Sequence, residues 1–265
     1  MLKNLTAFIA ILSLAAAAAA QQRSQADLVA TLRSGTPTER EAAIDRAAEI
    51  PPDERDTALW LALVHELERV SRESEAREDA LAAGKESPTH GRLGGAGAHY
   101  VPDLIGVVAE WKDIRVLPAL IAAPADGMIV TEPIVKFGDA AVPSLLDAVR
   151  RGRRSNVGGA LLALQYLLEG MHIAPYNITP AELSSRNRND IVRLARDLLR
   201  PKGAYWPHLP IVAGLALATG DADLRRQVEL LASEPGIVSQ VTGLVDAQSI
   251  DLVQHGIAAR LKQHQ

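Results

Sequence analysis

Apolar residues recur along this chain at the spacing of helices. The clearest stripes lie in residues 59–70, 142–149, 191–198 and 250–261. An α-helix has 3.6 residues per turn, so residues at i, i+3, i+4 and i+7 share one face. No stretch alternates apolar and polar residues as a half-buried strand does. The pattern therefore predicts an all-α protein with roughly ten to twelve short helices.

Residues that begin helices precede several of these stripes. Thr36-Pro37-Thr38-Glu39 has the composition of a capping box with proline at the first helical position, and residues 179–182 repeat it. Asp53, Asp113 and Gly138-Asp139 are expected to begin three further helices, because a short polar side chain can accept a hydrogen bond from a free helical amide.

The apolar pattern weakens from residue 71 to residue 98, where charged residues and glycines are frequent. Glu66 and Arg69 fall off the apolar stripe of their helix, and we expect them on a solvated face. Residues 72–83 are predicted to be helical. Residues 84–98 contain five glycines and few apolar residues, which indicates a flexible connector. The glycines do not have the spacing of a phosphate-binding loop.

The composition narrows the classes of protein that remain. The chain has 265 residues, with 44 Ala, 35 Leu and nine aromatic residues, which disfavours β-sandwiches and barrels. It has no cysteine, so disulfides and thiolate sites are excluded. The 28 basic and 32 acidic side chains give a net charge of −4, which does not favour nucleic-acid binding.

Residues 1–20 have the pattern of a secretory signal peptide. Lys3 is followed by an apolar stretch over residues 5–14 and by small residues that end at Ala20. This apolar stretch is short and alanine-rich for a membrane span, which needs roughly 20 apolar residues. We expect cleavage after Ala20, a mature chain without a stable membrane span, and a secreted or periplasmic location. An uncleaved N-terminal anchor is the alternative.

The middle of the chain contains a degenerate sequence repeat. Residues 113–120 and 139–146 each have an aspartate, then a proline, then paired apolar residues, and the two prolines are 25 residues apart. The segment Gly138-Asp139-Ala-Ala-Val-Pro143-Ser-Leu-Leu146 resembles the first helix of a HEAT-type repeat. Residues 37–43 are similar to the second helix of that family.

The resemblance covers residues 113–170 best, and residues 26–70 and 190–232 more loosely. The short period is similar to the bacterial form of HEAT repeats. The resemblance implies an α-solenoid of stacked antiparallel helix pairs over residues 21–265 that acts as a binding scaffold.

Motifs for chemistry are missing from the sequence. No two of the seven histidines have the spacing of metal ligands on a helix, and no serine stands in a nucleophile motif. We therefore predict no catalytic residue, no metal and no cofactor.

The most concentrated charge in the sequence is a cluster of arginines at residues 150–154. Guanidinium groups suit carboxylates and phosphates, although cations at the end of a helix also complement its dipole. If stacked helices bring two arginine-rich stretches together, they form a basic ridge for a partner. The candidate residues are Arg150, Arg151, Arg153, Arg154, Arg193 and Arg196.

The sequence favours a non-catalytic scaffold that binds another macromolecule, in particular a protein, through the solenoid surface. One alternative is an enzyme or small-ligand carrier with a site in the inner groove near His99, Tyr100 and Trp111. The other is a structural subunit of an envelope complex. The sequence identifies neither the partner nor the oligomeric state.

Overall fold

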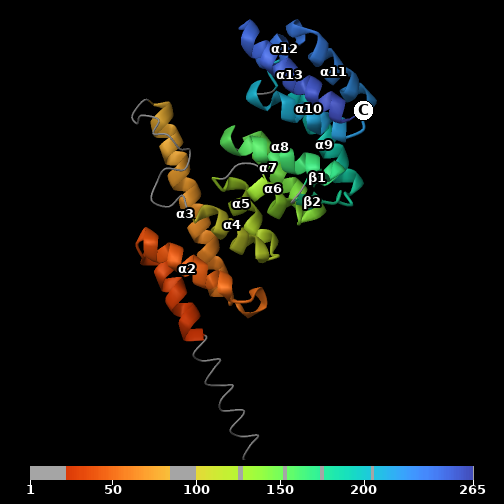
Figure 1. Ribbon diagram of the computed structural model, residues 1–265. Coiled ribbons are helices and arrows are strands. Elements are labelled where there is room, and N and C mark those ends of the chain that lie inside the picture. Colours follow the sequence, from red (N-terminus) through yellow and green to blue (C-terminus); the bar gives the residue numbers. More distant parts are fainter. Residues whose placement is uncertain are drawn as a thin grey trace, which may run out of the picture. The chain divides into compact units, whose positions relative to one another are not determined.

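The computed structural model describes residues 22–83, 100–124, 128–151, 154–173, 176–203 and 206–264 (Figure 1). Most of these residues are helical, which confirms the prediction of an all-α protein. The chain divides into two compact units, Met1–Ala119 and Leu120–Gln265, and we describe each unit by itself. The predicted signal peptide and the predicted connector lie outside the described residues.

In the part that the structure describes, the first unit begins with a helix over residues 22–34. Its other elements are α2 (Pro37–Glu49), η1 (Pro52–Glu54), α3 (Thr57–Ala82), α4 (Val101–Glu110) and η2 (Ile114–Val116). The predicted capping box at α2 is confirmed, because Thr36 Oγ1 accepts from Glu39 N and Glu39 accepts from Thr36 N. α4 packs against both α2 and α3.

The start of α3 differs from the prediction. Asp53 lies within the short turn η1, where Pro51 and Pro52 delay the helix. Asp56 precedes α3 instead, and its Oδ1 accepts from Leu59 N at 2.7 Å. The predicted stripe from Leu59 to Val70 is buried as expected.

Two tryptophans join the ends of α3 and α4. The rings of Trp60 and Trp111 stack with centroids 5.5 Å apart and an interplanar angle of 10°. Arg55 lies over Trp60 at 4.8 Å, and Arg115 lies over Trp111 at 5.0 Å. This stack of four side chains adds cation–π contacts to the stacking of a buried ring, Trp60, on a half-buried one, Trp111.

The second unit holds the remaining helices. The helix α5 (Leu117–Ala122) contains the boundary between the units. Then follow α6 (Met128–Val135), η3 (Gly138–Ala141), α7 (Val142–Arg151), α8 (Arg154–Glu169), β1 (Met171–Ile173), β2 (Tyr176–Ile178), α9 (Ser185–Leu198), η4 (Trp206–His208), α10 (Leu209–Ala218), α11 (Ala222–Ser233), α12 (Pro235–Thr242) and α13 (Ala247–Gln263).

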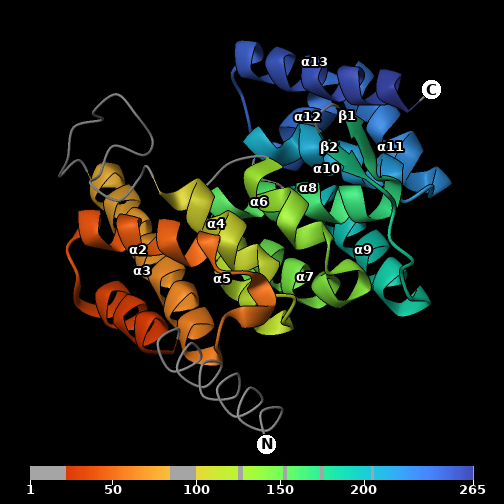
Figure 2. The ribbon, with the colours of Figure 1, turned by 60° about the horizontal axis from the view of Figure 1, so that its bottom comes forward.

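The helices of the second unit pack against one another in a continuous series. α8 packs against α6 and α10, and α10 packs in turn against α13. α7 packs against both α8 and α9, and α9 packs against α10. Figure 2 shows α13 beside α11 and α12, which it also contacts. α10 is buried on nearly every side, from Leu209 to Leu217, and forms the centre of this core.

Three features of the second unit were not predicted. Residues 179–182 do not begin a helix: α9 begins at Ser185, and Ser184 Oγ accepts from Asn187 N. The strands β1 and β2 pair in a small antiparallel sheet, with Met171 opposite Ile178. The short helix α12 also has too few apolar positions to form a recognisable stripe.

Candidate functional site

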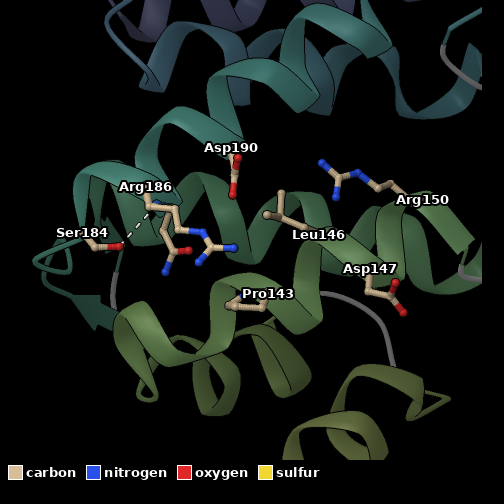
Figure 3. A pocket seen from close by; sticks show the side chains of 8 residues that line it. Pro143, Leu146, Asp147, Arg150, Ser184, Arg186 and Asp190 are labelled. Atoms are coloured by element: carbon tan, nitrogen blue, oxygen red, sulfur yellow. Dashed lines mark hydrogen bonds between the residues drawn. The ribbon is translucent and has the colours of Figure 1, made fainter.

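A groove of about 460 Å³ lies between α7 and α9. Pro143 and Leu146 supply its apolar surface, and charged side chains surround them (Figure 3). The other lining residues are Asp147 and Arg150 of α7 and Ser184, Arg186, Asn187 and Asp190 at the start of α9.

Arg150 and Arg186 are the cations of this groove. Figure 3 shows the two guanidinium groups pointing inward from opposite ends. Among the described residues, neither group has a hydrogen bond or an ion pair. The two carboxylates of the lining are each paired with an arginine outside it, Asp147 with Arg151 at 2.9 Å and Asp190 with Arg193 at 3.4 Å. Arg150 and Arg186 therefore leave excess positive charge at the groove.

The predicted basic ridge is brought together only in part. Arg150 and Arg151 end α7, and Arg193 lies on α9, which packs against α7. Arg196 is held by Asp221 at 2.5 Å, so it links α9 to the start of α11. Arg153 lies outside the described residues, and for Arg154 only the helical backbone is described.

Arg186 is the first residue of the second arginine-rich stretch of the sequence, residues 186–200, but the six candidate ridge residues do not include it. The repeated capping motif at residues 179–182 indicated an earlier start of this helix. With α9 beginning at Ser185, Arg186 is its second residue and faces α7.

Asp139 fixes the start of α9 at the edge of the groove. It was predicted to begin its own helix, but its Oδ1 instead accepts from Ser184 N at 2.9 Å and from Asn187 Nδ2 at 2.8 Å. These hydrogen bonds lower the pKa of Asp139 below its usual value, with that from Asn187 contributing most. The short turn η3 explains the difference, because it places Asp139 beside α9 before α7 begins.

The two groove arginines differ in their relation to the helix dipoles. Arg150 lies in the last turn of α7, where a cation is favourable. Arg186 lies in the first turn of α9, which has no acidic residue, and a cation there opposes the dipole. The stability of α9 therefore does not explain the presence of Arg186.

A second cluster of charged residues lies in the first unit, where the sequence predicted a solvated face. Glu66 is only 2% exposed. Its carboxylate accepts from Arg69 through both oxygens, at 2.7 and 2.8 Å, and from Tyr100 Oη at 2.7 Å, while Arg40 Nε lies 3.2 Å away. The prediction for Glu66 was wrong because α2 and α4 cover this side of α3.

Tyr100 is tied closely to this cluster. Burial, together with the neighbouring Glu66 carboxylate, raises the pKa of Tyr100 to about 12. The phenol also accepts from Arg69 Nη2 at 2.8 Å. Glu66 thus joins α3 to the start of α4 through Tyr100 and to α2 through Arg40.

The other predicted ligand site is not assembled around Tyr100 and Trp111. They flank α4 at opposite ends, about 16 Å apart along its axis for a rise of 1.5 Å per residue. Tyr100 is hydrogen-bonded within the Glu66 cluster, and Trp111 is stacked on Trp60. His99 lies outside the described residues.

Within the described ranges, no three histidine, aspartate or glutamate side chains are grouped so that they could hold a metal ion. Among the described helices, none combines the length and the hydropathy that a membrane crossing requires.

Comparison with known proteins gave no relative. No protein-family profile, no curated protein and no solved structure matches the chain significantly.

Proposed function

We propose that this protein is an exported, non-catalytic scaffold of HEAT-like repeats that binds another protein at the groove between α7 and α9. A solenoid places each helix against the helix two positions further along the chain. The contacts of α6 with α8, of α8 with α10 and of α7 with α9 follow this order and support the proposal.

The two segments that look repeated in the sequence also resemble each other locally. In each, a short 3-10 turn runs into an α-helix whose second residue is proline, Pro118 in α5 and Pro143 in α7. The same order of turn, proline and helix supports a repeated unit. The two repeated segments differ in the role of their aspartate. Asp113 accepts from Arg115 N within its own turn, whereas Asp139 accepts from Ser184 N at the start of α9.

The observation that carries the proposal is the pair of unpartnered guanidinium groups in the groove. Surface arginines in folded proteins commonly pair with nearby carboxylates, as Arg151 and Arg193 do here. Arg150 and Arg186 face an open, partly apolar surface instead. Arginine beside exposed apolar surface is typical of protein interfaces.

Site-specific photo-crosslinking tests this proposal. A photoreactive residue replaces Pro143 inside the groove, or Glu229 on the exposed side of α11 as the matched control. In cells of the source organism, we expect a defined crosslinked protein from position 143 and none from position 229. Equal crosslinking from both positions, or none from position 143, would contradict a binding role for the groove.

Export is tested on the same protein. The mass of the chain isolated from the source organism should correspond to a start at Gln21, because the signal peptide is removed after Ala20. A native mass that includes residues 1–20 would contradict cleavage. Fractionation then separates the alternatives, since an uncleaved anchor stays with the membranes and an exported chain does not.

A further inference from the structure

We propose, on the basis of the proposed function, that the groove between α7 and α9 binds an acidic peptide segment in which two carboxylates flank an apolar side chain. The arrangement of the lining matches this pattern. Pro143 and Leu146 form the apolar surface, and Arg150 and Arg186 point inward from its two ends.

The first step of the inference concerns the sign of the ligand. Arg150 and Arg186 have no counter-charge among the described residues, whereas both lining carboxylates already have an arginine partner. An incoming anion therefore gains two charge-assisted hydrogen-bond donors without first breaking an ion pair. A cationic ligand would instead have to displace Arg151 or Arg193.

The start of α9 supplies a second and independent argument. Amides at a helix start can bind anions, and here two of them already have acceptors, because Ser184 N donates to Asp139 and Asn187 N donates to Ser184. Arg186 adds a cationic side chain at this position although it opposes the helix dipole. A residue that is unfavourable for its own helix is typical of a functional position.

The residues that line the groove also favour a peptide over a nucleic acid as the ligand. Asp147 and Asp190 are part of the groove wall, and their carboxylates repel a continuous line of phosphates. A peptide has charges only where its side chains carry them, and its apolar residue can cover Pro143 and Leu146.

Fluorescence anisotropy with a designed probe tests the inference. The probe is a fluorescein-labelled peptide with the sequence Glu-Leu-Glu between Gly-Ser ends, and its controls carry Gln-Leu-Gln and Glu-Ser-Glu. We expect the full chain to bind the first peptide at least about tenfold more tightly than either control, and more weakly as salt is added. Equal binding of all three peptides would overturn the inference.

Variants of the full chain locate the binding. R150A and R186A should each weaken binding of the Glu-Leu-Glu probe by about tenfold, which is the value of one charge-assisted hydrogen bond. The matched control is R226A, since Arg226 on α11 is 73% exposed and lies 3.8 Å from Asp223. Equal losses in R226A and R186A would show non-specific attraction and overturn the inference.

Thermal unfolding separates a binding role of Arg186 from a structural one. Because Arg186 opposes the dipole of α9, R186A should melt at the same temperature as the wild type or higher. A binding loss together with a lower melting temperature would assign Arg186 to the fold and overturn the inference.

The remaining outcomes distinguish this inference from the proposed function. No binding of the Glu-Leu-Glu probe, with crosslinks retained at position 143, would reject the acidic peptide and leave the scaffold in place. Loss of both the peptide binding and the crosslinks at position 143 would reject the inference and the proposed function together. Tighter binding of a single-stranded oligonucleotide, abolished by R186A, would replace the peptide by a nucleic acid.

Discussion

Glu66 has a buried carboxylate that three side chains surround. Arg69 and Tyr100 hydrogen-bond to it, and Arg40 lies within ion-pair distance. A buried ion pair contributes little compared with an apolar replacement, but removal of one partner leaves the other charges without compensation. Glu66 is therefore a residue on which the packing of α2, α3 and α4 depends.

Replacement of Glu66 tests this dependence. E66Q keeps the shape of the side chain and removes its charge, so Arg40 loses its counter-charge and Arg69 keeps only that of Glu73. We expect a loss of about 3 kcal/mol in the free energy of unfolding. Denaturant unfolding followed by tryptophan fluorescence measures it, since Trp60 and Trp111 lie in the same unit. The control E68Q, at a side chain 41% exposed, should change the value by less than about 0.5 kcal/mol.

Tyr100 makes the stability of this unit dependent on alkaline pH. Its pKa is about 12 in the folded chain against 10.0 for an ordinary tyrosine. The protonated phenol is thus favoured by folding, and its contribution is fully present below pH 10 and is lost as the pH rises through about 12. The difference in unfolding free energy between wild type and Y100F should shrink over this range. A difference that stays constant from pH 8 to pH 12 would contradict the assignment.

Helix packing in the second unit depends on glycine at one contact. A Cβ at Gly214 of α10 would lie 2.7 Å from Gln165 Oε1 and 3.0 Å from Nε2. Gln165 is buried and donates to Glu169 at 2.6 Å, so it cannot move without loss of that hydrogen bond. Gly214 therefore allows α10 to lie close to α8.

Alanine substitutions test this contact. G214A should lower the free energy of unfolding by about 1–2 kcal/mol, because overpacking outweighs the better helix propensity of alanine. G159A in α8 is the matched control, since a Cβ there meets nothing within 4 Å, and it should stabilise the chain by about 0.5–1 kcal/mol. A stabilised G214A variant would show that the contact is loose.

The helices that the sequence predicted best are those with strong apolar stripes. The stripe from Leu59 to Val70 is buried, and the capping box at Thr36 forms. The motif at residues 179–182 has the same composition but begins no helix, because the local pattern cannot show that Asp139 binds the start of α9 from 45 residues away. Glu66 was misplaced for the same reason, since Arg40 and Tyr100 reach it from α2 and from the start of α4.

On the scale of the whole molecule, two compact units carry different kinds of charge cluster. Glu66 in the first unit is enclosed and fully partnered, which suits a structural role. The groove in the second unit is open, and its two arginines are unpartnered among the described residues. From the sequence, a basic ridge depended on whether stacked helices bring two arginine-rich stretches together. The sequence could not predict that Arg196 would pair with Asp221 and that Arg186 would face the groove.

The central claim is that the groove between α7 and α9 is the binding surface. NMR of the full chain, with labelled methyl and side-chain amide groups, tests it during titration with the Glu-Leu-Glu peptide. We predict that the shifts concentrate on the Leu146 methyls and the Asn187 amide and are absent in the R150A/R186A double variant. Shifts that concentrate on α11 or α13, or that persist in the double variant, would contradict it.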